Sequence, residues 1–306
     1  MPGFDLGRPI IRVITPSAAV RPAYPMDRFL LLAPALLLLF GLSGAFVVFV
    51  GLHAAGRPPH VSGAKHNQLF GLFCGRFIVW VLGPLERLLL GRVSPNAITA
   101  LSLVLCMLAG AAAALGHLPG AVWLFSSAGI LDVLDGRLAR LSGHQTAAGA
   151  LFDSVSDRWG ELCAFAGYAW FLHDSLWLFA VLGASAGSMM VSYTRARGEG
   201  LGVDLAGGIM QRAERVVLVS AGTLVAAWYG ANPDTIDLVV PIVGGTLAIC
   251  AVASTATAVG RWIFAYKVLA RRAPTVAVVE PVVAETTPAT PVVATRPLGP
   301  ALHHPN

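Results

Sequence analysis

Four aspartates that lie inside or against long apolar segments constrain this chain more than any other feature. Asp132 and Asp135 form the first pair, and Asp153 and Asp157 form the second. An ionised carboxylate in the hydrocarbon of a bilayer costs about 3 kcal/mol or more unless it is paired, metal-bound or exposed to water. Four of them at spacings of three and four residues therefore indicate a functional site, and the spacing is typical of a metal site.

The composition predicts a membrane protein. Of the 306 residues, 56% are hydrophobic and only 12% are charged, which is about half the charged fraction of an average soluble domain. Several apolar segments reach the length of about 20 residues that a helix needs to cross a bilayer. The net charge of +5 fits basic cytoplasmic loops, and it does not favour a nucleic-acid partner because the arginines form no run. The predicted fold class is an all-α integral membrane protein.

The predicted organisation has four parts. Residues 1–52 form an N-terminal arm with an extra transmembrane helix at 29–52. Residues 53–93 form a basic linker with an interfacial amphipathic helix at 69–90. Residues 94–272 form a six-transmembrane-helix catalytic domain, and residues 273–306, which are rich in Pro, Thr, Val and Ala, form a disordered tail. The six core spans are expected at residues 96–115, 119–141, 146–172, 175–194, 209–229 and 236–267.

The distribution of basic residues predicts the orientation. Three of the loops between the six spans contain no Lys or Arg, and the loops on the opposite side carry nearly all the arginines of the core. By the positive-inside rule the basic side is cytoplasmic. All four aspartates fall at that side, so we expect the site to face the cytoplasm.

The spacing also predicts how the site is built. Asp132, Gly136 and Arg140 are four residues apart and share one face of a helix, and the next helix repeats this spacing from Gly149 to Asp157. Two neighbouring helices would thus present their carboxylates to one cavity, beside glycines that allow close approach of a ligand. Carboxylate-rich sites select hard cations such as Mg²⁺, Mn²⁺ or Ca²⁺, and two such ions assist in-line displacement at phosphorus. Capping or interhelical polar contacts are the structural alternative.

These residues resemble the signature of the CDP-alcohol phosphotransferases, D-x-x-D-G-x-x-A-R followed by G-x-x-x-D-x-x-x-D. The resemblance extends over the six-helix core. All the fixed positions are matched, by Asp132, Asp135, Gly136, Ala139, Arg140, Gly149, Asp153 and Asp157.

The resemblance implies an enzyme that transfers the phosphatidyl group of CDP-diacylglycerol, or of a similar CDP-lipid, to a polar alcohol and releases CMP. It implies Mg²⁺ or Mn²⁺ as cofactor, as two ions, and in many members a homodimer. The implied metal ligands are Asp132, Asp135, Asp153 and Asp157, of which Asp157 is also the catalytic base. The implied CDP-binding residues are Asp132, Gly136, Ala139, Arg140 and Gly149.

The segment from Ser192 to Arg215 resembles the branch that makes phosphatidylinositol phosphate and archaetidylinositol phosphate, which implies a bacterial or archaeal cytoplasmic membrane. In that branch the arginines of this segment bind the phosphate of the acceptor. Gly198 and Gln211 depart from the pattern of the branch. The implied acceptor ligands are Arg195, Arg212 and Arg215, with Arg261 as a further candidate. Ordinary cytoplasmic arginines are the alternative interpretation. Inositol phosphate is the expected acceptor, and glycerol 3-phosphate or another alcohol remains open.

Three other functions compete with this hypothesis. Intramembrane prenyltransferases also use aspartates and magnesium, but they have two separated aspartate motifs and lack the G-x-x-A-R element. An ion-binding transporter would use acids to mark its pathway, yet it would not require the adjacent arginine and glycines. A non-catalytic homologue would not require the complete motif.

Overall fold

The computed structural model describes residues 28–58, 71–143, 145–205 and 207–272. All its regular elements in these residues are helices, in agreement with the predicted all-α class. The arm before residue 28, part of the linker and the predicted disordered tail lie outside the described residues. The helices are α1 Arg28–Ala54, α2 Gly71–Leu89, α3 Pro95–Ala114, α4 Leu118–Leu141, α5 Ala147–Phe171, α6 Leu178–Gly200, α7 Arg212–Gly230 and α8 Val239–Arg271, with a 3-10 helix, η3, at Pro233–Leu238.

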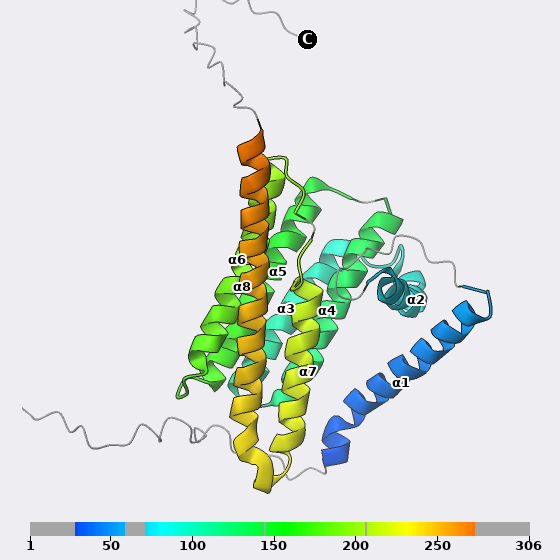
Figure 1. Cartoon of the computed structure of the whole chain (residues 1–306). Coiled ribbons are helices and arrows are strands. Elements are labelled where there is room, and N and C mark those ends of the chain that lie inside the picture. The colour runs from blue at the N-terminus through cyan, green and yellow to red at the C-terminus, as the bar shows by residue number, and fades with distance from the viewer. Residues whose placement is uncertain (1–27, 59–70, 144, 206, 273–306) are drawn as a thin grey trace, which may run out of the picture.

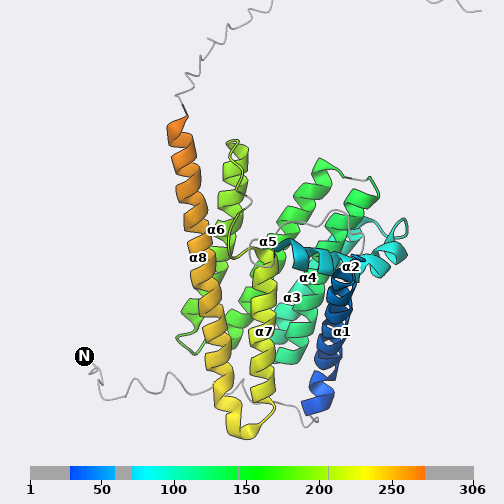
Figure 2. The same ribbon diagram turned by 45° about the vertical axis from the view of Figure 1, so that its right-hand side comes forward.

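Helices α3 to α8 form a bundle, and α1 and α2 lie beside it (Figure 1). The predicted amphipathic segment is α2, which runs across the direction of the bundle helices (Figure 2). Among the described residues, three helices are long and apolar enough to cross a membrane, at Pro95–Ala114, Leu118–Leu141 and Pro233–Arg271. The chain is thus an integral membrane protein whose regular elements, over the residues described, are all helical.

The helix ends that border the predicted site follow from local chemistry. Ser94 caps α3, where its hydroxyl accepts a hydrogen bond from the amide of Ala97 at 3.3 Å, and Pro95 occupies the first turn. Thr146 caps α5 in the same way, accepting from the amide of Gly149 at 3.0 Å. The two helix starts lie side by side, because a Cβ added to Gly149 on α5 would lie 3.3 Å from Oδ1 of Asn96 on α3.

Two predicted boundaries were wrong near the acceptor segment. We expected a span to end at residue 194, but α6 continues to Gly200, so Arg195 lies on a helix. We expected the next span to begin at residue 209, but α7 begins at Arg212. The intervening loop contains Gly202 and Gly208 at φ values of 73° and 147°, a conformation that interrupts a helix and that glycine adopts most easily. The difference places Arg212 in the first turn of α7.

Glycines allow the helices around the site to pack closely against one another. α3 packs against both α4 and α5. A Cβ atom added to Gly167 on α5 would lie only 2.0 Å from the carbonyl oxygen of Gly110 on α3, so the two backbones touch there. Gly183 and Gly187 on α6 face α8 of the same chain, so these two glycines serve internal packing and supply no seam for the expected homodimer.

Candidate active site

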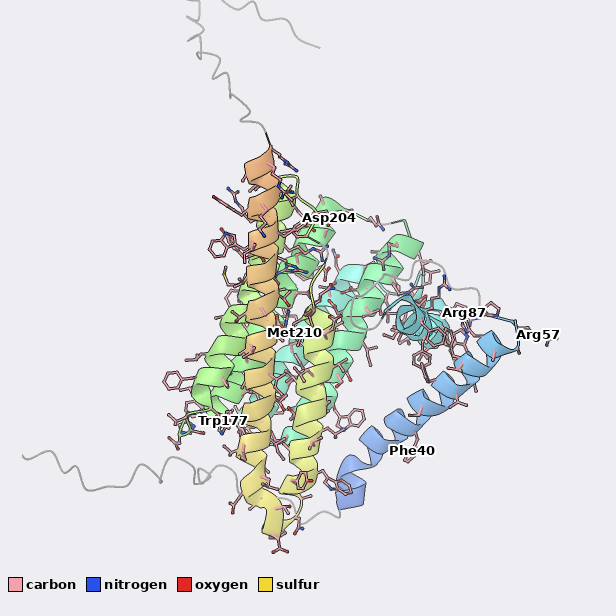
Figure 3. The ribbon with its side chains drawn as sticks, viewed as in Figure 1. Phe40, Arg57, Arg87, Trp177, Asp204 and Met210 are labelled. Carbon is pink, nitrogen blue, oxygen red and sulfur yellow. The ribbon has the colours of Figure 1, made fainter. Side chains whose placement is uncertain are left out.

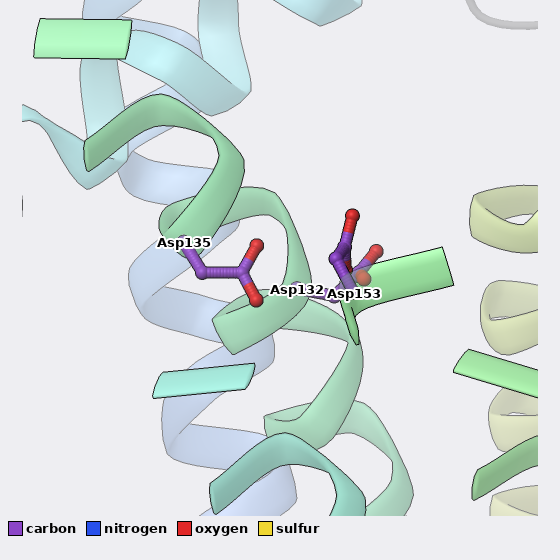
Figure 4. Close-up of side chains that lie close together, drawn as sticks. All are labelled: Asp132, Asp135 and Asp153. Carbon is purple, nitrogen blue, oxygen red and sulfur yellow. The ribbon is translucent and has the colours of Figure 1, made fainter. Parts of the chain in front are cut away.

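Three of the four aspartates converge. Asp132 and Asp135 project from α4 and Asp153 from α5, and their carboxyl groups approach one another (Figure 4). One oxygen from each of the three lies within 4.8 Å of the others. The sequence prediction that two helices pool their carboxylates is confirmed for this group. Such close acids repel one another strongly unless a cation lies among them.

Asp135 shows that the group fits a divalent ion. The carboxylate is buried, and its Oδ2 accepts a hydrogen bond from the Thr99 hydroxyl at 2.6 Å. Its Oδ1 is also buried and accepts no hydrogen bond from the described residues. A buried carboxylate oxygen of this kind is costly unless it binds an ion. The hydrogen bond from Thr99 on α3 orients the carboxylate, as residues behind metal ligands commonly do; the motif gave no sign of this contact.

Asp157 lies outside this group of three. Its Oδ1 is paired with Nη1 of Arg212, and the same nitrogen donates to Oδ1 of Asp132 at 2.5 Å. Arg212 therefore links the predicted base on α5 to one of the clustered acids on α4. The prediction that Asp157 is both a ligand and the base stays a prediction.

The predicted CDP-binding residues lie along the accessible side of the same region. Gly136 and Ala139 are half-buried and Arg140 is exposed. A Cβ added to Gly136 would meet only Nη1 of Arg140, at 3.6 Å, so the space above this glycine is open. A Cβ added to Gly149 would lie 3.0 Å from the Thr146 hydroxyl oxygen. The helix backbone is thus exposed to an incoming ligand at Gly136.

The predicted acceptor arginines have different surroundings. Arg195 is half-exposed, and its Nε donates to Glu199 at 2.8 Å. Arg215 is 2% exposed, and its Nε and Nη2 donate to the two carboxylate oxygens of Glu161 at 2.5 and 3.0 Å. Glu161, on α5 one turn beyond Asp157, was missed by the sequence analysis. The acidic residue follows the motif at a helical spacing of four, which was the available signal.

Arg261 on α8 is also buried. Its Nε donates to the carbonyl of Gly207 at 2.7 Å, and its Nη1 donates to the carbonyl of Val191 at 2.8 Å. Arg261 therefore joins α8 to α6 and to the loop before α7, the segment where Figure 3 labels Asp204 and Met210.

A second buried ion pair holds α2 on the motif helix. Arg137 donates through Nε and Nη2 to the two carboxylate oxygens of Glu86, the second contact being 3.1 Å long. The side chains of both residues are 8% exposed. Arg137 lies between Gly136 and Arg140, so α2 is attached to the segment predicted to bind CDP. The sequence analysis identified neither residue as part of the site.

Residues 92–257 match the family described as CDP-alcohol phosphatidyltransferase. The chain belongs to this family. Membership makes it a transferase of phospholipid synthesis, and it confirms the resemblance seen in the aspartate motif.

Named relatives of this CDP-alcohol phosphatidyltransferase are phosphatidylinositol phosphate synthases. The Mycobacteroides abscessus protein is 35% identical over 114 residues, which cover 36% of this chain and 50% of that protein. The Streptomyces avermitilis protein is 34% identical over 225 residues, covering 69% of this chain and 88% of that protein. An archaetidylinositol phosphate synthase of Methanothermobacter thermautotrophicus is 39% identical over 135 residues, covering 44% and 67% respectively.

Solved structures agree with the fold of the phosphatidyltransferase. The phosphatidylinositol phosphate synthase of Mycobacterium tuberculosis with CDP-DAG bound matches at a TM-score of 0.53 and 27% identity, covering 61% of this chain and 94% of that one. The same protein in complex with manganese and citrate matches at a TM-score of 0.52 and 28% identity, covering 60% and 88%.

Proposed function

We propose that this enzyme transfers the phosphatidyl group of CDP-diacylglycerol to inositol phosphate and releases CMP. Relatives of this chain are named phosphatidylinositol phosphate synthases, after the lipid that this reaction would form. The synthase of Mycobacterium tuberculosis has been solved with CDP-DAG bound. The observation that carries the choice of a phosphorylated acceptor is a group of four arginines beside the carboxylate cluster.

These arginines come from four different helices. Arg158 on α5 interacts electrostatically with Arg195 on α6 and Arg215 on α7, and Arg261 on α8 interacts with the same two. Within the same set of interactions the nearby carboxylates are Glu161, Glu199 and Asp153. Four guanidinium groups thus face three carboxylates. The excess positive charge favours a phosphate group, which arginine binds with paired hydrogen bonds.

The arginine group lies next to the metal-binding acids. Arg158 also interacts electrostatically with Asp153, one of the three clustered aspartates. A phosphate held by the arginines therefore leaves the rest of an acceptor close to the reacting diphosphate. Free inositol would leave the excess charge uncompensated, whereas glycerol 3-phosphate, the second candidate, would not.

The chemistry follows from the roles of the acids. The oxygen of an acceptor hydroxyl forms a bond to the lipid-side phosphorus of the donor, the bond from that phosphorus to the bridging oxygen breaks, and CMP leaves with the electron pair. Asp157 accepts the hydroxyl proton. Two divalent ions, Mg²⁺ or Mn²⁺, held by Asp132, Asp135, Asp153 and Asp157 would neutralise charge on the diphosphate.

The donor pocket is proposed to lie along α4. Arg140 would contact the diphosphate, and the open backbone at Gly136 would allow close approach of the nucleotide, with Ala139 and Gly149 beside it. α3 to α8 would be the six spans of the catalytic domain, α1 an additional span, and α2 an interfacial helix. The acids would face the cytoplasm, where the acceptor is dissolved. The homodimer expected from the family remains a prediction.

The decisive experiment is a product analysis with the purified full-length enzyme. CDP-diacylglycerol and Mg²⁺ are supplied with inositol phosphate, glycerol 3-phosphate, free inositol or serine, and lipid products are identified by mass. We expect phosphatidylinositol phosphate as the main product. Preferential formation of phosphatidylglycerol phosphate would favour the second acceptor, and formation of no lipid product from any acceptor would refute the assignment.

A further inference from the structure

The C-terminal end of α6 is capped by an arginine from another helix. The last residue of α6 is Gly200, and Leu201 and Gly202 follow it, Gly202 at a φ of 73°. Arg272, directly after α8, donates through Nη1 to the carbonyl of Leu201 at 2.9 Å and through Nη2 to the carbonyl of Gly202 at 2.8 Å. Carbonyl groups at this end of a helix lack partners within the helix and attract a cation. The guanidinium therefore fastens the end of α6 to the end of α8.

This cap is connected to one of the predicted acceptor arginines. The amide of Gly202 donates to the carbonyl of Glu199 in the last turn of α6, at 2.9 Å. The carboxylate of Glu199 accepts a hydrogen bond from Nε of Arg195 at 2.8 Å. Gly202 thus lies between Arg272 and the residue whose carboxylate orients Arg195.

Arg195 requires such support because other cations surround it. Its electrostatic interactions with Arg158 and Arg261 are both repulsive. The side chains of Arg195 and Glu199 are 45% and 46% exposed, and an ion pair this exposed contributes little stability by itself. The turn that carries Glu199 therefore has to be held in place by other contacts until an anionic acceptor compensates the repulsion.

The loop that follows α6, residues 201–211, is held differently at its other end. There the amide of Met210 donates to Oγ1 of Thr257 at 3.1 Å, and the carbonyl of Gly207 accepts from Nε of Arg261 at 2.7 Å. Thr257 and Arg261 are buried, whereas Arg272, about three turns further along the chain, is exposed. A change at Arg272 can thus release the start of the loop without opening the core of the bundle.

We propose that Arg272 is a positioning residue for the acceptor. By capping α6 it holds the turn that carries Glu199, and through this turn it holds Arg195 where the phosphate of the acceptor binds. Arg272 itself does not touch the substrate. The inference rests on the proposed transfer to a phosphorylated alcohol. It concerns a residue beyond the family match, which ends at residue 257.

The first test compares Arg272→Gln with Arg271→Gln in the purified full-length enzyme. Arg271 is the neighbouring exposed arginine in the last turn of α8, so each variant removes one positive charge from the same place. We expect Arg272→Gln to raise the KM for inositol phosphate by about tenfold, as the loss of one or two hydrogen bonds would, while kcat and the KM for CDP-diacylglycerol change by less than about twofold. Arg271→Gln should keep all three wild-type values.

Hydrogen–deuterium exchange measures the cap without turnover. The amides of Leu201, Gly202 and Val203 donate to carbonyls in the last turn of α6, so they should exchange about tenfold faster in Arg272→Gln than in Arg271→Gln. The further variant Arg272→Lys keeps the charge but offers one nitrogen in place of two. Its exchange rate and its acceptor KM should therefore lie between those of the wild type and of Arg272→Gln.

The outcomes separate this proposal from the proposed function. If the wild type makes no lipid product from inositol phosphate or glycerol 3-phosphate, the proposed function fails and the positioning role fails with it. If the wild type uses either acceptor, equal KM values for that acceptor in Arg272→Gln and Arg271→Gln overturn only the positioning role, even where exchange is faster. An equal rise in both the donor and the acceptor KM also overturns it. If Arg272→Gln does not fold, a wild-type acceptor KM in Arg272→Lys overturns the proposal.

Discussion

The ion pair between Arg215 and Glu161 allows a test of whether Arg215 stabilises the fold, binds the acceptor, or does both. The side chains of Arg215 and Glu161 are 2% and 4% exposed, and Ser188 donates a further hydrogen bond to Glu161. The substitution Arg215→Met removes the cation and leaves Glu161 as a buried, unpaired carboxylate. Removal of one partner from a buried pair costs about 3–5 kcal/mol.

That loss is large enough to measure in detergent micelles. A change of about 1 kcal/mol shifts the unfolding midpoint of a 150–250-residue domain by about 2–4 °C. We therefore expect Arg215→Met to lower the midpoint by about 6–20 °C in a thermal scan followed by circular dichroism. The double variant Arg215→Met/Glu161→Gln removes both charges, so its stability should return to within about 1 kcal/mol of the wild type. A loss in the double variant equal to the sum of the two single losses would refute the reasoning.

The folded double variant then tests the predicted contact with the acceptor. If Arg215 contributes to the phosphate site as proposed, the KM for inositol phosphate should stay raised by about tenfold, although stability has recovered, and the KM for CDP-diacylglycerol should change little. Full recovery of the acceptor KM would show that Arg215 only stabilises the packing of α7 against α5.

Three further predictions concern the motif and its support. Asp157→Asn should reduce CMP release by about 10²–10⁴-fold, the usual contribution of a general base, while binding of radiolabelled CDP-diacylglycerol persists; an unchanged rate would remove Asp157 as the base. Thr99→Val should weaken Mn²⁺ binding by about 10–100-fold, measured by electron paramagnetic resonance, and equal affinities would contradict the orienting role of Thr99. Glu86→Gln should lower stability by about 3 kcal/mol because Arg137 loses its buried anion, whereas the exposed control Arg87→Gln should not.

The sequence predicted the helices and the clustered acids because both depend on local spacing. Apolar length and proline positions located α3 to α5 to within one or two residues, since a helix that crosses hydrocarbon satisfies its backbone internally. The convergence of Asp132, Asp135 and Asp153 followed from helical periodicity on two helices close in the chain. The end of α6 was misjudged because polar residues continue the helix beyond its apolar part, and the start of α7 was misjudged because the apolar Ile209 and Met210 belong to the preceding loop.

The partners of the charged residues could not be predicted in the same way. Glu161 and Arg215 are 54 positions apart, and Glu86 and Arg137 are 51 apart. The count of arginines in each loop predicts which side of the membrane they face, but it does not distinguish a buried ion pair from a ligand contact. That distinction depends on how the helices pack, and contacts such as that of Gly110 on α3 with Gly167 on α5 are not revealed by any charge pattern.

The same long-range packing decides whether the motif forms a working site. Arg212 is separated by 80 positions from Asp132 and by 55 from Asp157, so the cation that these acids share comes from a helix outside the signature. α4 and α5, each packed against α3, carry the three clustered carboxylates, and the surroundings of Asp157 also include Arg212 of α7. The signature thus specifies the carboxylates, whereas the ion pair of Asp157 depends on a helix that lies outside the signature.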